Sequence, residues 1–191
     1  MKKKLQKNKA CFLDRDGVLI EEKNYLSSPS DVIIFSEAIQ ALKILRKNGF
    51  KIIVITNQAG VAKGYYKEES IFDVHKGIDC QLAKAKLKID KYYHCPHHLE
   101  GTVKKYSIAC KCRKPAPGLI LDAVKDFNID LNKSFLIGDK ISDIEAAQNV
   151  GCPAILVKTG HGLDYIEKAR SKNIMIAENI LKAVKLFISS H

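Results

Sequence analysis

The sequence has 191 residues, 46% of them hydrophobic, which is enough for one globular domain to bury its own core and too little for a second full domain. No apolar run approaches the roughly 20 residues of a membrane helix. The first residues, MKKKLQKNKACFLDRDG, combine lysines with a short apolar stretch that runs directly into acids, unlike a signal peptide. These features argue against a membrane protein and predict a cytosolic one.

The formal net charge is +11, and five of these charges come from lysines in the first nine residues. We expect residues 1–9 to form a flexible, solvated tail. The remaining +6 favours a polyanionic partner, which would be either nucleic acid or a phosphorylated metabolite. Because lysine-rich surfaces also arise for solubility alone, net charge does not choose between these classes.

Short apolar runs alternate with segments of helical periodicity, which is the pattern of βα units and of a parallel sheet covered on both faces. In chain order, the sequence predicts a strand at Ala10–Leu13, a helix with Ser36 as N-cap that stops at Gly49, a strand at Lys51–Ile55, a helix at Glu68–Leu87 and a weaker strand at Tyr92–Cys95. There follow a helix at Pro117–Phe127, a strand at Ser134–Ile137, a helix opened by a Ser142-x-x-Glu145 capping box and a strand at Ala154–Val157. A last helix carries the apolar stripe Ile180, Leu181, Val184, Phe187 and Ile188.

The predicted fold class is therefore α/β, a Rossmann-like parallel sheet flanked by helices, in a single domain over residues 1–191. One segment breaks the rhythm: residues 96–115 have no clear periodicity. Irregular connections of this length in compact domains are usually functional or held in place by a further interaction.

Two acids end the first predicted strand. In Phe12-Leu13-Asp14-Arg15-Asp16-Gly17-Val18, alternation along an extended chain aims the carboxylates of Asp14 and Asp16 the same way. Ligands of open parallel sheets bind at the carboxyl ends of strands. Two such carboxylates repel unless a cation lies between them, and oxygen ligands of this kind suit Mg²⁺. Taken alone, the motif is also compatible with a polar turn that merely ends the strand.

Polar groups follow two further predicted strands. Thr56-Asn57-Gln58 comes after Ile52–Ile55, where a hydroxyl and backbone N–H groups can hold phosphate oxygens, and Gly138-Asp139 comes after Phe135–Ile137. Asp143 lies four residues later at a helix start, where acids are common in any case. Lys114 precedes another helix and offers a fixed positive charge.

Taken in order, Asp14-x-Asp16, Thr56, Lys114 and Asp139 with Asp143 resemble the four motifs of the haloacid dehalogenase (HAD) phosphatases. The resemblance spans roughly Phe12 to Val157. It implies that Asp14 is the nucleophile and Asp16 the general acid and base. Thr56 and Lys114 would hold the phosphoryl group, and Asp143 would orient Lys114 or a metal-bound water. The implied Mg²⁺ ligands are Asp14, Asp139 and the backbone carbonyl of Asp16.

Inside the irregular segment, Cys95-Pro96-His97 and Cys110-Lys111-Cys112 supply three thiols and an imidazole, which is the composition of a closed structural zinc site. We expect zinc to clip this loop, residues 95–115. From composition alone His94 and His98 compete with His97 as the nitrogen ligand. The three other cysteines lie in apolar or helical contexts and are expected to be buried structural thiols: Cys11, Cys80 and Cys152.

The C-x-H and C-x-C pairs followed at once by Arg113-Lys114-Pro115 resemble the D-glycero-D-manno-heptose 1,7-bisphosphate phosphatases and, next nearest, the histidinol-phosphate phosphatase domains. The resemblance favours His97 as ligand, and the length of the loop favours the heptose type. It implies removal of the C7 phosphate to leave heptose 1-phosphate, for nucleotide-heptose synthesis in a bacterial envelope pathway. Arg113 would read the distal phosphate, because a guanidinium binds phosphate bidentately.

The same resemblance implies a set of substrate contacts, comprising Glu22, Lys23, Asn24, Tyr25, Asn57, Gln58, Ala59, Arg113 and Lys140. The absence of a large insertion after the first two strands implies a capless enzyme whose zinc loop shapes the pocket. We expect a monomer with no nucleic-acid or membrane partner. Two alternatives stay open: a histidinol-phosphate phosphatase, and a basic, zinc-clipped module that binds nucleic acid, although acids at three strand ends would repel a phosphate backbone.

Overall fold

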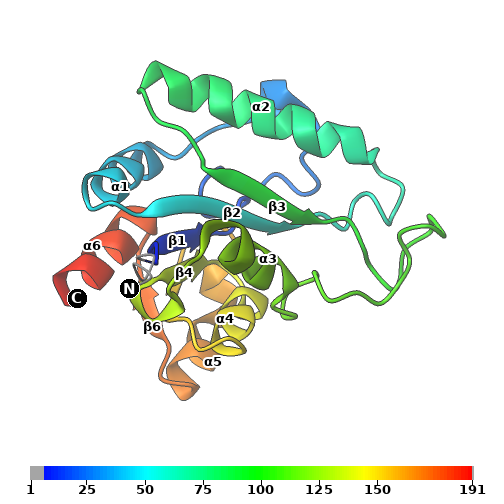
Figure 1. Cartoon of the computed structure of the whole chain (residues 1–191). Helices are drawn as coiled ribbons and strands as arrows, with labels where there is room; N and C mark the ends of the chain where they lie inside the picture. Colours follow the sequence, from blue (N-terminus) through cyan, green and yellow to red (C-terminus); the bar gives the residue numbers. More distant parts are fainter. Residues whose placement is uncertain (1–6, 191) are drawn as a thin grey trace, which may run out of the picture.

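The computed structural model describes residues 7–190, and its centre is a sheet of six parallel strands in the order β3-β2-β1-β4-β5-β6 (Figure 1). The strands are β1 (Ala10–Leu13), β2 (Lys51–Asn57), β3 (Lys91–Cys95), β4 (Phe135–Gly138), β5 (Ala154–Val157) and β6 (Met175–Ala177). The predicted α/β class is confirmed. Residues 1–6 of the expected N-terminal tail lie outside the described part of the chain.

Six helices flank this sheet: α1 (Ser36–Lys47), α2 (Glu68–Lys84), α3 (Gly118–Phe127), α4 (Ile141–Gln148), α5 (Ile166–Ser171) and α6 (Ile180–Ser190). Short 3₁₀ turns cover Pro29–Asp31, Leu131–Lys133 and Gly162–Tyr165. Buried residues of α1, α2 and α6 form one apolar cluster with one face of the strands, and those of α3, α4 and α5 pack on the other. No helix in residues 7–190 is long and apolar enough to cross a membrane.

Alternation along the central strands explains why both faces are covered. In β1, Cys11 and Leu13 belong to the α1/α2/α6 cluster, whereas Ala10 and Phe12 belong to the opposite one. All four are fully buried, as expected for a parallel sheet with helices on both faces. The near-continuous apolar strands in the sequence are thus a direct consequence of this layering.

Three details of the predicted elements are wrong. The capping box is not formed by Ser142 and Glu145, because α4 begins earlier and the Asp143 carboxylate accepts the Lys140 backbone N–H at 3.0 Å. Ser36 is the first residue of α1 and not its cap, since the Phe35 carbonyl accepts the first helical hydrogen bond, from Ala38.

Pro117 likewise precedes α3 as its N-cap and does not lie in the helix. Two elements were missed. Strand β6 has only three residues at the edge of the sheet, with Met175 40% exposed, and α5 is a helix of six residues. Both are too short to give a clear periodic signal.

Phe135 of β4 is the centre of an aromatic group under α6. Its ring stacks on Phe187 at 3.9 Å between centroids and meets Phe50 edge-on at 5.6 Å. Phe135 is fully buried. Its loss would therefore leave a cavity against the central strand of the fold.

We expect Phe135→Ala to lower the free energy of unfolding by about 3–5 kcal/mol, the usual range for a buried phenylalanine, as measured by urea denaturation. Leu121→Ala is the control, because Leu121 is 49% exposed on α3 and its truncation should change stability by less than about 0.5 kcal/mol. Equal losses in the two variants would contradict the packing described.

Candidate active site

A pocket of about 430 Å³ opens at the carboxyl ends of β1, β2 and β4. Its lining includes Asp14 and Asp16 after β1, Thr56 near the end of β2, and Lys114. The residues that the sequence singled out at separate strand ends are thus neighbours in the fold, because parallel strands deliver their carboxyl ends to one edge.

Asp14 is 6% exposed at the floor of this pocket. Its backbone N–H donates to the Ile137 carbonyl at 3.0 Å, which extends the β1–β4 pairing by one residue. One side-chain oxygen, Oδ1, accepts the Arg15 backbone N–H at 2.7 Å and lies 3.0 Å from Nζ of Lys114. Within residues 7–190 no hydrogen bond reaches Oδ2. That oxygen is available to a ligand in the pocket.

Asp16 points into the same pocket with different neighbours. Nε of Arg15 donates to Asp16 Oδ2 at 3.1 Å, Nη2 donates to Oδ1 at 3.2 Å, and Nε2 of Gln58 donates to Oδ2 at 3.0 Å. The Arg15 side chain is almost fully buried, whereas that of Asp16 is 15% exposed. Asp16 is therefore a fixed carboxylate that still reaches the pocket.

Lys114 supplies the buried positive charge. Its Nζ lies 2.7 Å from Asp143 Oδ1 and 3.0 Å from Asp14 Oδ1, and it donates to the Ile55 carbonyl at 2.8 Å. Although burial opposes the charged amine, the carboxylates of Asp14 and Asp143 raise the pKa of Lys114. The lysine therefore stays protonated.

The backbone of Lys114 is held by one side chain. Asn57 at the end of β2 accepts the Lys114 N–H with Oδ1 and donates to the Lys114 carbonyl with Nδ2, both at 3.0 Å. Both ends of the Asn57 amide are used in this way, although the residue also lines the pocket.

Asp139 follows β4 and is fully buried. Its Oδ2 accepts the His161 backbone N–H at 2.8 Å, but its Oδ1 has no partner in the described structure. Burial, together with the charges of Asp14 and Asp143, raises the pKa of Asp139 to about 8. Carboxylate oxygens of these three acids lie within 4.8 Å of one another. An orphaned buried oxygen in an all-oxygen cluster is what a hard divalent cation requires.

Two glycines let the backbone approach Asp139 closely. A Cβ on Gly17 or Gly160 would lie 2.4 or 2.2 Å from Asp139 Oδ2, and both residues have positive φ, +80° and +58°. The acid cluster therefore depends on side-chain-free backbone on two sides. In residues 7–190 the cluster comprises the carboxylates of Asp14, Asp139 and Asp143, and that of Asp16 is not part of it.

Thr56 is 1% exposed, and its hydroxyl accepts Nε2 of Gln58 at 2.8 Å. The Gln58 side chain is itself buried, so the structure gives it internal partners in addition to its place in the pocket lining. Ala59 continues the lining from the same loop.

The rim of the pocket contains most of the expected substrate contacts. Glu22, Asn24, Tyr25, Arg113 and Lys140 all line it. Lys140 Nζ lies 3.5 Å from Glu22 Oε2, and the carboxylates around it, Asp139 first among them, raise the pKa of Lys140 although burial opposes its charge. Asn24 and Tyr25 have positive φ, +44° and +65°, an uncommon conformation for residues with side chains.

Lys23 is the exception among these contacts, because it is exposed and does not line the pocket.

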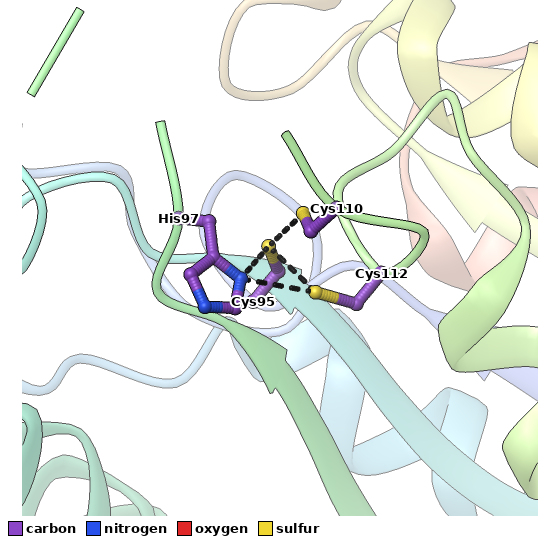
Figure 2. A group of neighbouring side chains, drawn as sticks. All are labelled: Cys95, His97, Cys110 and Cys112. Carbon is purple, nitrogen blue, oxygen red and sulfur yellow. Dashed lines mark hydrogen bonds between the residues drawn. The ribbon is translucent and has the colours of Figure 1, made fainter. Parts of the chain in front are cut away.

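Cys95, His97, Cys110 and Cys112 converge beside the end of β3 (Figure 2) and form what we name the cysteine knuckle. Cys95 Sγ lies 3.5 Å from Cys110 Sγ and 3.1 Å from Cys112 Sγ, and His97 Nδ1 lies 3.4 Å from Cys112 Sγ. Four ligand atoms at the corners of a tetrahedron, each about 2.3 Å from a central zinc, would be slightly farther apart than these distances. The knuckle is close to the shape that zinc requires.

The two rival histidines are engaged elsewhere. His94 Nε2 lies 3.1 Å from Glu68 Oε1, and His98 Nδ1 accepts the Glu100 backbone N–H at 3.2 Å. His97 is thus the nitrogen donor of the knuckle. Its carbonyl also accepts Arg113 Nη1 at 3.1 Å, which joins the knuckle to the pocket rim.

Several residues of the site were not identified from the sequence: Arg15, Tyr66, Ser142, Gly160 and His161. The position of Arg15 between two acids could have identified it. Thr159-Gly160-His161 follows the strand predicted at Ala154–Val157, just as the other motifs follow their strands, and this position could have identified Gly160 and His161.

Comparison with known proteins agrees with this geometry. A family model described as HAD-hydrolase-like matches residues 111–183. The D-glycero-alpha-D-manno-heptose-1,7-bisphosphate 7-phosphatase of Photorhabdus laumondii is 41% identical over 181 residues, 94% of this chain and 97% of its own. A D-glycero-beta-D-manno-heptose-1,7-bisphosphate 7-phosphatase of Pasteurella multocida is 37% identical over 179 residues, 93% and 96% of the two chains.

Among solved structures, the D,D-heptose 1,7-bisphosphate phosphatase of B. bronchiseptica, complexed with magnesium and phosphate, superposes with a TM-score of 0.84 at 26% identity, covering 96% of this chain and 99% of that one. Relatives that match nearly end to end at this identity share the whole fold and not a fragment of it. The chain belongs to the heptose-1,7-bisphosphate 7-phosphatase family of HAD-like hydrolases.

Proposed function

We propose that this protein is a phosphatase that removes the C7 phosphate of D-glycero-D-manno-heptose 1,7-bisphosphate and leaves heptose 1-phosphate. The observation that carries the proposal is the pair Asp14 and Asp16 in one pocket with different partners, Lys114 for the first and Arg15 with Gln58 for the second. Two carboxylates in unlike environments suit the two roles that phosphate hydrolysis through an enzyme ester requires.

In the first step, Oδ2 of Asp14 attacks phosphorus, the bond from phosphorus to the sugar oxygen breaks, and Asp16 gives its proton to that leaving oxygen. In the second, the Asp16 carboxylate takes a proton from water as the water oxygen attacks the aspartyl-phosphate. Inorganic phosphate then leaves and the Asp14 carboxylate is restored. Thr56 and Lys114 hold the phosphoryl oxygens during both steps.

Asp14, Asp139 and the Asp16 carbonyl would hold Mg²⁺, with Asp143 keeping Lys114 in place. The fit rests on the orphaned Oδ1 of Asp139 and on the all-oxygen donor set. Mg²⁺ bound there neutralises the charge of the transferring phosphoryl group.

The sugar and its second phosphate would lie against the pocket rim. Arg113 is the group suited to the distal phosphate, because its guanidinium lines the pocket while Nη1 is anchored on the His97 carbonyl. The proposed substrate contacts are Glu22, Lys23, Asn24, Tyr25, Asn57, Gln58, Ala59, Arg113 and Lys140. Of these, Lys23 would have to move to reach the substrate.

Phosphate release from the α and β anomers of the heptose 1,7-bisphosphate should be fast in Mg²⁺, because relatives carry names of both anomers. Histidinol phosphate should be turned over at least about 100-fold less efficiently, since it has no second phosphate for Arg113. The measurement is kcat/KM for each compound. Preference for histidinol phosphate would replace the proposed substrate while leaving the aspartate chemistry in place.

We expect Asp14→Asn to lower kcat by at least about 10³-fold, because an amide cannot form the phosphate ester. Substrate binding and the melting temperature should be retained, as measured by calorimetry and thermal unfolding. Asp122→Asn, an exposed site on α3, is the matched control and should leave kcat unchanged. Retained turnover in Asp14→Asn would overturn the nucleophile assignment.

The cysteine knuckle is proposed to hold structural Zn²⁺. Three sulfurs and one imidazole nitrogen complete a tetrahedral set with no position left for catalysis. Burial raises the pKa of the Cys95 thiol, so a metal that binds the thiolate relieves an unfavourable ionisation. The site would clip the loop that delivers Arg113 and Lys114.

The purified chain should contain one zinc per molecule by elemental analysis, and Cys112→Ser should lose it. We expect this variant to melt at least about 4 °C lower and to show a raised KM for the bisphosphate, because Arg113 is anchored on the knuckle. Cys80→Ser is the control. Cys80 was expected to be buried, but its thiol is exposed on α2, outside the knuckle. Undiminished zinc in Cys112→Ser would exclude the knuckle as the metal site.

A monomer acting in the cytoplasm, within nucleotide-heptose synthesis for an envelope glycan, completes the proposal. The relatives' names support a role in heptose metabolism, and the free cysteines in residues 7–190 suit a reducing compartment. A nucleic-acid-binding role is disfavoured, because the pocket concentrates buried carboxylates where a phosphate backbone would have to approach.

A further inference from the structure

A buried hydrogen-bond chain lies behind Asp16. Gln58 Nε2 donates to Asp16 Oδ2 at 3.0 Å, and Tyr66 Oη donates to Gln58 Oε1 at 2.7 Å. Gln58 is only 4% exposed, and its backbone N–H is fixed to the Cys95 carbonyl at 2.7 Å. The hydrogen bonds therefore run from Tyr66 through Gln58, whose backbone is fixed at the end of β2, to the Asp16 carboxylate, which is proposed to transfer protons.

The orientation of the Gln58 amide decides what Asp16 meets. As observed, Nε2 gives one hydrogen to Asp16 and lies 2.8 Å from the Thr56 hydroxyl, so both donors serve the pocket. A flipped amide would present Oε1 instead. Oxygen beside the ionised Asp16 is repulsive, but beside protonated Asp16 it would accept the proton that the leaving group needs.

The Tyr66 hydroxyl opposes that flip. Burial raises the pKa of Tyr66 to about 12, so the hydroxyl keeps its hydrogen at neutral pH and requires an acceptor. Gln58 Oε1 is that acceptor in the observed orientation, whereas a flipped amide would turn an N–H group toward it.

The ring of Tyr66 fits because residue 60 is glycine. A Cβ there would lie 2.3 Å from Tyr66 Cε1, which is closer than two non-bonded carbon atoms can approach. The Tyr66 ring therefore packs directly against the backbone of the loop after β2.

We propose that Tyr66 is a positioning residue that acts through Gln58 to hold the amide hydrogen toward Asp16, so that the Asp16 proton goes to the leaving oxygen. The inference rests on the proposed function, in which Asp16 protonates that oxygen. In this proposal the buried side chain of Gln58 positions Asp16 and Thr56 and does not contact the sugar directly.

The test uses the dependence on the leaving group. Benzyl phosphate releases an alkoxide that needs a proton, whereas p-nitrophenyl phosphate, of similar size, releases a phenolate that does not. In Tyr66→Phe we expect kcat/KM for benzyl phosphate to fall about 10-fold or more, part of the range for general acid catalysis. The kcat/KM for p-nitrophenyl phosphate should stay within about twofold, because it reports only steps up to the first bond cleavage.

Two further variants sharpen the result. Tyr65→Phe removes the hydroxyl of the exposed neighbour, which does not line the pocket, and should leave both substrates unaffected. Gln58→Leu also removes the hydrogen bond to Thr56, so it should lower kcat/KM for both esters and lower it more for benzyl phosphate. Adding Tyr66→Phe to it should cost nothing more, since the two residues act in series.

An equal fall for both esters, or no fall for either, would overturn the role of Tyr66 while leaving the phosphatase in place. A protein that releases no phosphate from the heptose 1,7-bisphosphate in Mg²⁺ before substitution would instead overturn the proposed function, and the positioning role with it. Melting temperatures of all variants separate these outcomes from misfolding.

Discussion

Repulsion among three buried carboxylates is the constraint on which this edge of the sheet depends. Asp14, Asp139 and Asp143 bring oxygens within 4.8 Å of one another, where like charges are expensive in a poorly polarisable interior. Lys114 compensates two of these charges, those of Asp14 and Asp143, by direct contact. Asp139 contacts no lysine in residues 7–190, and its Oδ1 is left without a partner there. Burial and the neighbouring acids raise the pKa of Asp139. We therefore expect the site to be complete only when a metal is bound.

Lys114 lies on an irregular loop, and ordering such a loop costs much conformational entropy. Two sets of contacts hold the loop in place. Asn57 fixes the Lys114 backbone through both ends of its amide, and the cysteine knuckle gathers both ends of the loop next to β3 (Figure 2). Since Arg113 is tied to the His97 carbonyl, the two groups proposed to meet the two ends of a bisphosphate, Arg113 and Lys114, are adjacent in the chain and share one support.

Much of this was predictable, because the motifs lie at strand ends and parallel strands deliver their ends to one place. The sheet and the convergence of Asp14, Thr56 and Asp139 at one edge follow from that rule. Lys114 and the knuckle ligands lie in the irregular loop, and they were predicted from the cysteine and histidine composition and from the resemblance to known families. The capping box was misassigned because Ser142 and Glu145 match the pattern on paper, whereas Asp143 reaches the Lys140 N–H in space. Strand β6 was missed because a strand of three residues is too short to show a period. The closeness of Gly17 and Gly160 to Asp139 joins segments far apart in the chain, so spacing could not reveal it.

The two aspartates of the first motif illustrate the limit of sequence in another way. Asp14 and Asp16 are the same residue type, two positions apart, and both line the pocket, so spacing alone gives no reason for unlike roles. Their neighbours supply it. Asp14 lies within the acid cluster and contacts Lys114, whereas Asp16 is held by Arg15 and by the Gln58 amide, which Tyr66 keeps in one orientation. Division of labour between identical groups is therefore a property of the packed environment, and the groups behind the aspartates belong to the catalytic apparatus as much as the motif itself.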